Sequence, residues 1–321
     1  MIKFGIIGAG WRSEFYLRIA ALLPSKFSVS GIYIRNSEKQ KEFADKYNVR
    51  ICSSLEALLK TDFDFIVSCV SKDNISEMIK TLAAKDIPVL TETPVTDGLL
   101  KCRVQVAEQF YFMPRNQAYK RIIESGILGT VHSVRLSCCH DYHAASLIRF
   151  FLDTGFEKPE ITSISITDPV TRYNSRAGYL KSPAVIKAEE KIKIFKFKDR
   201  TAVYDFSFEQ YISDIRSSQI TIRGTNGEIV NNTCSYLKDG VPQRFDICRN
   251  ACGTEESLDG MCLFNITGNG KVLYTNPFPY SRLSDEEIAI ATCLVKMKEY
   301  LDTGKEFYSA KDACFDYTLF E

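Results

Sequence analysis

The stretch Lys3-Phe4-Gly5-Ile6-Ile7-Gly8-Ala9-Gly10-Trp11-Arg12-Ser13 decides the fold of the N-terminal part of the chain. A short apolar run, 3–7, enters a glycine turn, and apolar side chains then recur at helical spacing until Pro24. A strand, a glycine turn and a helix in this order are typical of the first half of a dinucleotide-binding βαβ unit. The segment therefore predicts a nucleotide-binding domain at the start of the chain.

The glycines suit a phosphate-binding turn. Gly8 permits the tight turn, Gly10 lets the backbone approach a pyrophosphate, and the helix that follows offers free N–H groups and its positive dipole end. The third glycine position of the motif holds Ser13, which is small enough for close helix packing. We expect the turn and the first helical residues to contact the cofactor: Gly8, Ala9, Gly10, Trp11 and Arg12. A purely structural turn is the alternative.

Strands and helices continue to alternate after this unit. Strands are predicted at 28–34, 63–70 and 87–91, and helices at 37–47, 55–60 and 74–84. This alternation predicts an α/β Rossmann domain, a doubly wound parallel sheet, over residues 1–118. Ligands of such sheets bind at the carboxyl ends of the strands, so the expected cofactor contacts extend to Cys69, Val70, Glu92 and Thr93.

The choice of cofactor is read at the end of the second strand. NAD-preferring domains usually place a carboxylate there for the ribose 2′-hydroxyl. The residues present are Tyr33-Ile34-Arg35-Asn36-Ser37, which include no carboxylate, and Arg35 and Asn36 can receive a 2′-phosphate. NADP(H) is therefore slightly favoured over NAD(H). The alternative is that Arg35 is a solvated loop arginine.

A second domain is predicted from 119 to 321. After a helix at 119–124, apolar and polar residues alternate at 131–139, 161–167, 192–198, 202–211 and 219–223. In this pattern Tyr204, Phe206 and Phe208 share one face. We expect an α+β domain with a large, mainly antiparallel open sheet. A late helix is predicted from Ser284, with Glu287 in capping-box spacing, to Gly304.

The composition restricts the class of binding partner. The 321 residues carry a net charge of only +1, which leaves no overall field to recruit nucleic acid or a membrane surface. No apolar run is long enough for a signal peptide or a membrane span, so we expect a cytoplasmic protein with a small-molecule substrate. The eleven cysteines are expected to be reduced thiols, and their spacing with the three histidines predicts no metal site.

The segment His140-Asp141-Tyr142-His143 is the candidate for proton transfer. If Asp141 caps the following helix, His143 lies in the first turn, where the positive helix end disfavours imidazole protonation. A neutral His143 can act as a general base, Tyr142 can give a proton to a carbonyl, and His140 can contact the substrate. The alternative is a histidine that ties the helix start to the sheet. A metal at His140 and His143 is disfavoured because no third ligand is near in sequence.

Two further polar residues follow predicted strands. Glu92 is placed to contact the nicotinamide ribose or the substrate, as a catalytic candidate, and its alternative is an exposed strand-end glutamate. Gln109, in the strand-like run 103–112, is a candidate substrate contact with the same ambiguity.

The layout resembles the Gfo/Idh/MocA (glucose-fructose oxidoreductase, inositol dehydrogenase and rhizopine catabolism) family. The resemblance rests on the glycine turn, on the stretch Val89-Leu90-Thr91-Glu92-Thr93-Pro94 where the family has Glu-Lys-Pro, on 122–129, on His143 with its helix, and on the hairpin 220–229. It implies an NAD(P)-dependent oxidoreductase that acts on a sugar, a cyclitol or a related polyol or carbonyl compound. It also implies a homodimer or homotetramer formed through the open sheet face.

The chain departs from this family at its catalytic positions. The family's lysine corresponds to Thr93, whose hydroxyl cannot move the proton at neutral pH, and its acidic residue corresponds to Ser146. The segment 93–101 is also too short for the usual crossover helix. A variant catalytic set is therefore expected. The alternatives are a catalytically inactive dinucleotide-binding sensor or partner protein, and a lyase or glycosidase that oxidises its substrate transiently.

Overall fold

The computed structural model describes residues 1–98, 102–254, 256 and 260–321. The chain forms two compact units, each described by itself. The first contains Met1–Pro114, Asn250–Phe264 and Thr275–Glu321, and the second contains Arg115–Arg249 and Asn265–Tyr274. The division expected from the sequence, 1–118 and 119–321, groups the chain differently, because the C-terminal helices pack with the first unit.

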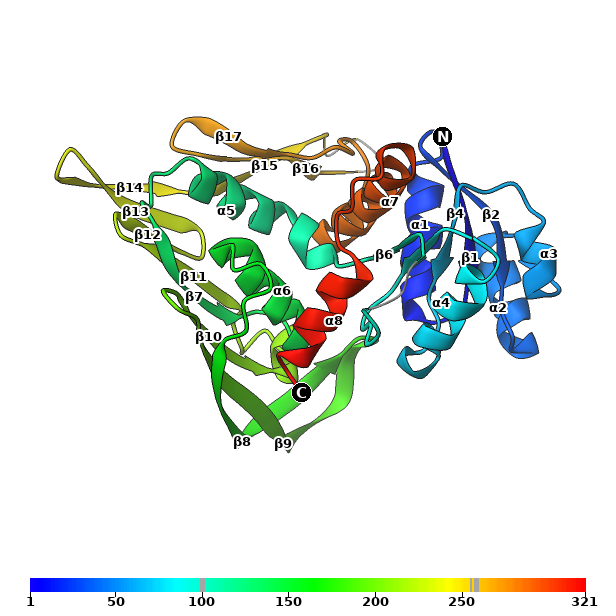
Figure 1. The fold of residues 1–321 in the computed structure, drawn as a ribbon, viewed down its shortest axis with the longest axis horizontal. Helices are drawn as coiled ribbons and strands as arrows, with labels where there is room; N and C mark the ends of the chain where they lie inside the picture. The colour runs from blue at the N-terminus through cyan, green and yellow to red at the C-terminus, as the bar shows by residue number, and fades with distance from the viewer. Residues whose placement is uncertain (99–101, 255, 257–259) are drawn as a thin grey trace. The chain divides into compact units, whose positions relative to one another are not determined.

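The first unit is a doubly wound α/β Rossmann domain, as predicted. Its six strands are all parallel in the order β3-β2-β1-β4-β5-β6 (Figure 1). The strands are β1 (Ile2–Ile7), β2 (Phe27–Tyr33), β3 (Ile51–Cys52), β4 (Phe65–Ser68), β5 (Val89–Thr91) and β6 (Val104–Val106). The helices are α1 (Trp11–Leu22), α2 (Ser37–Tyr47), α3 (Leu55–Leu59), α4 (Ile75–Ala83), α7 (Asp285–Thr303) and α8 (Ala310–Thr318), with 3₁₀ turns η1 (Lys72–Asn74) and η2 (Gln109–Phe112).

Helix ends follow local capping signals. The Ser54 hydroxyl accepts a hydrogen bond from the Ala57 N–H (3.1 Å) at the start of α3. At the start of α7, Ser284 and Glu287 form the predicted capping box, and Gly304 ends the helix with a φ of 74°. The prediction for this last helix is confirmed.

The connection from β5 to β6 is short. Its described residues, 92–98 and 102–103, contain no helix, although β5 and β6 are parallel neighbours. The strand expected at 103–112 is only Val104–Val106, because the chain then turns into η2.

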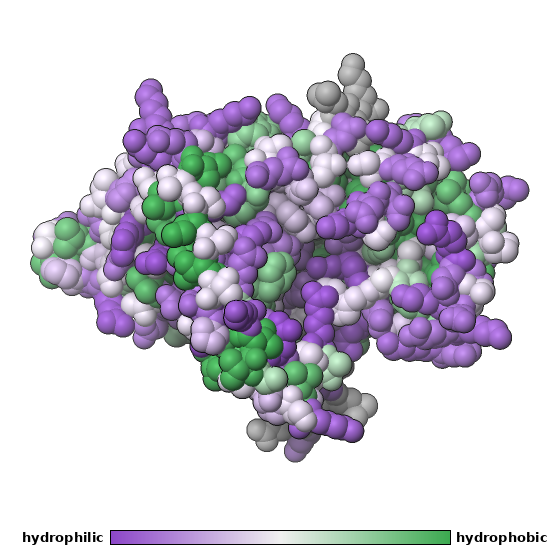
Figure 2. Space-filling model, turned by 90° about the horizontal axis from the view of Figure 1, so that it is seen from below, coloured by the Kyte–Doolittle hydropathy of each residue, from purple (hydrophilic) through white to green (hydrophobic). Residues whose placement is uncertain are grey.

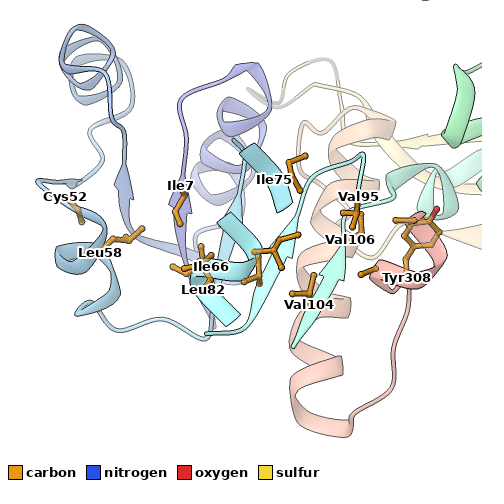
Figure 3. Close-up of a cluster of buried hydrophobic side chains, with 14 residues drawn as sticks. Ile7, Cys52, Leu58, Ile66, Ile75, Leu82, Val95, Val104, Val106 and Tyr308 are labelled. Atoms are coloured by element: carbon orange, nitrogen blue, oxygen red, sulfur yellow. The ribbon is translucent and has the colours of Figure 1, made fainter. Parts of the chain in front are cut away.

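A buried apolar cluster holds the first unit together (Figure 3). Leu58 and Ile66 are fully buried, and Tyr308 brings the C-terminal segment against Val106 of β6. The cluster extends beyond these residues to Ile7, Cys52, Ile75, Leu82, Val95 and Val104. Burying such side chains is the main favourable term in folding, so this cluster fixes the sheet and the position of its strand ends.

The second unit is an α+β fold with a large, mainly antiparallel sheet, as predicted. Its eight strands have the order β14-β13-β12-β11-β7-β10-β9-β8, and only β10 and β7 pair in parallel among the described strands. The strands are β7 (Val131–Ser137), β8 (Glu160–Ser175), β9 (Gly178–Lys196), β10 (Thr201–Ser207), β11 (Gln219–Gly224), β12 (Gly227–Val230), β13 (Thr233–Lys238) and β14 (Val241–Asp246). Helices α5 (Pro114–Glu124) and α6 (Asp141–Leu152) lie against one face of this sheet (Figure 1).

Strands β15 (Cys248–Cys252), β16 (Cys262–Gly268) and β17 (Lys271–Thr275) form a separate three-stranded sheet.

No helix in the part of the chain that the structure describes is both long and apolar enough to cross a membrane. On the face of the molecule in Figure 2, hydrophilic side chains cover most of the surface and hydrophobic ones gather in small patches.

The face of the sheet beneath α6 is buried at β10. Tyr204 and Phe206 point to this face and are almost fully buried. Phe208 does not join them: it is 57% exposed, because the chain leaves the strand and forms the 3₁₀ turn η3 (Phe208–Tyr211). The predicted shared face is therefore wrong at Phe208, although alternation holds for the other two residues.

Candidate functional site

The glycine turn between β1 and α1 has the geometry of a phosphate-binding turn. Gly8 has a φ of +108°, and a Cβ added there would lie 2.5 Å from the carbonyl oxygen of Cys69, so only glycine fits. Gly10 is exposed, and a Cβ there would meet only the same oxygen at 3.8 Å. Gly10 is also the N-cap of α1 and provides no side-chain cap. The start of α1 is therefore open to a ligand, and the residues fit a dinucleotide pyrophosphate.

The end of β2 is also accessible. Arg35 and Asn36 are both exposed, and the Asn36 side chain caps α2 by accepting from the Lys39 N–H (3.0 Å). Sequence reasoning missed Lys39, whose ammonium donates to the carbonyl of Ala9 (3.2 Å) beside the glycine turn. The sequence could have indicated Lys39, because Asn36 is a typical helix cap and a cap at position 36 places Lys39 in the first turn of α2.

Glu92 is not an exposed strand-end residue. It is 8% exposed, and Tyr16 donates a hydrogen bond to its carboxylate (2.5 Å). The Nε of Arg12 lies 3.3 Å from Glu92, and its Nη1 lies 2.9 Å from Glu286. Burial raises the pKa of Glu92, and the charge of Arg12 opposes that shift. The exposed alternative is therefore wrong.

The Arg12 guanidinium lies between two carboxylates. It also lies over the rings of Trp11 and Phe15, at 5.0 and 5.1 Å from their centroids. These contacts hold the side chain in place, so the part of Arg12 best able to meet a phosphate is its backbone N–H at the helix start. The predicted cofactor contacts of Arg12, Trp11 and Glu92 stay predictions.

The neighbouring residues are enclosed in the same unit. Gln109 is buried, and the orientation of its amide that satisfies both atoms donates to the carbonyl of Ala107 (3.0 Å) and accepts from Arg12 (3.3 Å). Glu108 is fully buried and accepts from the Phe110 N–H (3.1 Å), and burial raises its pKa to about 8. Cys69 is buried, whereas Val70 and Thr93 are half-buried at the ends of their strands.

The second group of predicted residues gathers at the start of α6. Helix α6 begins at Asp141 itself, with His140 as the N-cap and no side-chain cap. The prediction that Asp141 caps the helix is wrong, because the helix already includes Asp141 and His140 holds the N-cap position. The Asp141 N–H donates to the Tyr204 hydroxyl (3.2 Å). His143 is the third helical residue, in the first turn as expected, and is 4% exposed.

The rings at this helix start form a compact cluster. Ring centroids lie 4.8 Å apart for His140 and His143, 4.5 Å for Tyr142 and His143, and 5.1 Å for His140 and Tyr142. The Tyr211 hydroxyl is 2.9 Å from Nδ1 of His140. Burial, followed by the charge effect of His143, lowers the pKa of His140 to about 3, so His140 is neutral near pH 7.

Ser146, which occupies the family's acidic position, is buried, and its hydroxyl donates to the carbonyl of His143 (2.8 Å). The Ser146 hydroxyl is therefore engaged by the backbone of α6. Beside the ring cluster is a cavity of about 200 Å³, which we call the β9 cavity. Its lining includes Asp141, Arg172, Lys191, Tyr204 and Glu209. Sequence reasoning did not assign Lys191 or Tyr204 to a site, although alternation on β9 and β10 places both on the helix-covered face.

The glycine turn between β1 and α1, together with the Rossmann sheet, is typical of the class of dinucleotide-binding proteins. Residues 2–109 match the model of the oxidoreductase family with NAD-binding Rossmann fold, Gfo/Idh/MocA. The resemblance seen in the sequence is confirmed over these residues.

Sequence relatives include L-aspartate dehydrogenases of two archaea. The protein from Methanocaldococcus jannaschii is 23% identical over 138 residues, which are 42% of this chain and 49% of that protein. The protein from Methanococcus maripaludis strain C7 is 26% identical over 179 residues, 53% of this chain and 64% of that protein. The chain thus matches about half to two thirds of the length of these curated relatives.

Solved structures share the fold over nearly the whole chain. An oxidoreductase from Agrobacterium radiobacter in complex with NAD+, L-tartaric acid and magnesium has a TM-score of 0.67 at 16% identity, covering 99% of this chain and 94% of that one. A putative myo-inositol dehydrogenase from Sinorhizobium meliloti 1021 has a TM-score of 0.64 at 15% identity, covering 99% and 95%. At these identities the likeness concerns the fold.

The buried Glu108 makes stability depend on pH. Its folded pKa of about 8 lies above its ordinary value of 4.5, so the native state holds a proton that the unfolded state releases between these values. The free energy of unfolding should therefore fall as pH rises from about 5 to about 8, by up to ~1.4 kcal/mol per pH unit from this group. Glu108→Gln should remove that slope. Urea unfolding at several pH values measures it, with the exposed Glu38→Gln as the control; equal slopes in both variants would contradict the assignment.

Proposed function

We propose that the protein is an NAD(P)-dependent oxidoreductase that transfers hydride to or from a sugar, a cyclitol or a related polyol or carbonyl compound. The observation that carries the proposal is the open glycine turn, in which Gly8 can only be glycine and Gly10 leaves room over the start of α1. The family's description as NAD-binding oxidoreductases supports it. When bound, the nicotinamide supplies the hydride acceptor or donor.

The chain's own residues would hold the cofactor along the carboxyl edge of the sheet. Backbone groups at Gly8, Ala9 and Gly10 would bind the pyrophosphate, with the N–H groups at the start of α1. The strand ends at Cys69, Val70 and Thr93 would flank the nicotinamide half. Glu92 would act there chiefly by fixing Arg12 and the local charge, since both its oxygens are engaged inside the unit.

Proton transfer would fall to the ring cluster at the start of α6. The hydroxyls of Thr93 and Ser146 cannot act as bases at neutral pH. The imidazole of His140 is neutral and can accept a proton, and it is packed with the rings of Tyr142 and His143. We assign His143 to exchange the proton of the substrate hydroxyl, with Tyr142 as the neighbouring donor and His140 as a substrate contact.

A catalytically inactive sensor or partner protein is the second candidate, and the same Thr93 and Ser146 favour it. Both candidates bind the cofactor, so binding does not separate them. Turnover separates them. It is measured on a panel of polyols with NAD+ and NADP+, and on carbonyl compounds with the reduced cofactors.

Gly10→Asp tests the cofactor site. Its Cβ would meet only the Cys69 carbonyl oxygen at 3.8 Å, so the fold should tolerate the change. The new carboxylate would face the pyrophosphate, and a like-charge contact of this kind should weaken binding by at least ~100-fold. Titration of NADH and NADPH fluorescence measures the affinity, and the melting temperature without cofactor controls for folding. Unchanged affinity in a folded variant would remove the glycine turn from the site.

For cofactor choice we propose NADP(H), with NAD(H) as the alternative. Exposed Arg35 and Asn36 at the end of β2, together with Lys39, support this preference. Arg35→Ala should weaken NADPH binding about tenfold, the value of a charge-assisted phosphate contact, and leave NADH binding unchanged. Lys41→Ala, an exposed cation on the same helix α2, is the control in the same titration. Equal loss for both cofactors would contradict a 2′-phosphate contact.

We further propose a homodimer or homotetramer in the cytoplasm. The sheet face opposite α6 carries exposed Ile164 (57%) and Ile194 (44%), which a second copy would cover. The eleven free cysteines are consistent with a reducing compartment. Ile164→Asp with Ile194→Asp should shift the protein to monomer in light scattering after size exclusion. Ile215→Asp, at an exposed site outside the strands, should not; an unchanged mass in the double variant would exclude this face.

A further inference from the structure

We propose that Tyr211 is a positioning residue that holds His140 as the neutral tautomer with its ring proton on Nε2. This Nε2–H donates to the Tyr142 hydroxyl, so the proton of Tyr142 is directed toward a bound substrate. The tautomer follows from hydrogen bonds within the second unit, and its use in catalysis rests on the proposed function.

The first observation is that one hydroxyl contacts His140 twice. The Tyr211 hydroxyl accepts the backbone N–H of His140 (2.9 Å) and lies 2.9 Å from Nδ1 of the same residue. Among the described residues, this hydroxyl makes no other hydrogen bond. Burial raises the pKa of Tyr211, so the hydroxyl keeps its proton near pH 7. The one acceptor that the protein offers to this proton is Nδ1, which then carries no proton of its own.

The second observation is the difference between the two ring contacts. His140 is neutral near pH 7, because its pKa is about 3, so only one of its ring nitrogens carries a proton. Hydrogen bonds donated by hydroxyls are typically shorter than those donated by N–H groups. The 2.9 Å contact at Nδ1 therefore fits a hydroxyl donor, and the 3.3 Å contact between Nε2 and the Tyr142 hydroxyl fits an N–H donor. The bond at one nitrogen sets the tautomer at the other.

The third observation is the anchoring of η3 beside His140. The Gln210 side chain donates to the hydroxyl (2.9 Å) and the carbonyl (3.2 Å) of Ser137, at the end of the strand that leads into His140. The rings of Phe208 and Tyr211, both in this turn, lie 5.1 and 5.8 Å from the His140 ring. Tyr211 therefore comes from a turn that is fixed to the same strand, which holds its hydroxyl in place.

The tautomer gives Tyr142 a defined role. Because Nε2–H donates to its oxygen, Tyr142 does not donate back to that nitrogen, and its proton is directed to another acceptor. In the proposed reaction this acceptor is the substrate oxygen whose proton His143 exchanges. The bond from His140 polarises the Tyr142 hydroxyl, since linked hydrogen bonds strengthen one another. A stronger donor at the substrate oxygen stabilises the negative charge that develops there.

Nitrogen-15 NMR of the full chain, labelled at histidine, tests the tautomer. The chain has only three histidines, so the His140 signals are assigned by their loss in His140→Gln. We expect a protonated Nε2 and an unprotonated Nδ1 near pH 7, and the same pattern down to about pH 5, because the pKa of His140 is about 3. Tyr211→Phe should leave His140 as a mixture of both tautomers. Tyr179→Phe, at a tyrosine that is 79% exposed, is the matched control and should leave the His140 signals unchanged.

Two spectra would overturn the proposal: a His140 with its proton on Nδ1 in the unaltered protein, or a Tyr211→Phe variant with the same His140 tautomer as the unaltered protein. The first needs no variant, so the proposal stays testable if Tyr211→Phe does not fold.

Turnover of the substrate panel tests the role in catalysis. Tyr211→Phe should lower kcat about tenfold with KM nearly unchanged, because the lost bond supports charge that develops only in the transition state. An unchanged kcat would contradict this role. The expected tautomer in a protein that turns over no compound would contradict the oxidoreductase proposal alone, and turnover with the other tautomer would contradict the present inference alone.

Discussion

The contact between Gly8 and the carbonyl of Cys69 is the constraint on which the cofactor edge depends. Any side chain at position 8 would lie 2.5 Å from that oxygen, so the ends of β1 and β4 can approach only around a glycine. These two strands are neighbours at the centre of the order β3-β2-β1-β4-β5-β6, where the connections change direction. Ligands bind at such switch points in open α/β sheets. The glycine thus places the start of α1 at the carboxyl edge of the sheet, at this switch point.

Local signals made most of this fold predictable. Ser54, Ser284 and Gly304 mark helix ends because a cap depends on a few neighbouring residues. The parallel pairing of β10 with β7 was not predictable, since alternation along a strand is the same whichever way its neighbour runs. The start of α6 was misjudged for a related reason. Asp141 has the right residue type for a cap, but the helix begins one residue earlier than expected, with His140 as the N-cap and the Asp141 N–H bonded to the distant Tyr204.

The sequence predicted which residues gather at the candidate site better than it predicted what surrounds them. His140, Tyr142 and His143 do cluster, because they are adjacent in sequence at a helix start. The surroundings of Glu92 were not foreseeable, because its partners Arg12 and Tyr16 are 80 and 76 positions away in the sequence. A strand-end carboxylate is exposed or buried according to what other elements bring to it. No local pattern reports that.

The two groups of buried charge differ in a way that bears on function. Around Arg12 each charged group has a partner: Glu92 and Glu286 both contact the guanidinium, and Tyr16 donates a hydrogen bond to Glu92. Such a network satisfies itself, so a ligand gains little by entering it. The β9 cavity has charged side chains of both signs in its lining, with Asp141, Glu189 and Glu209 against Lys187, Lys191 and Arg172. Groups that line a cavity can be reached by a ligand, whereas the groups around Arg12 contact one another, so a small polar substrate is better sought at the ring cluster and the β9 cavity than at Glu92.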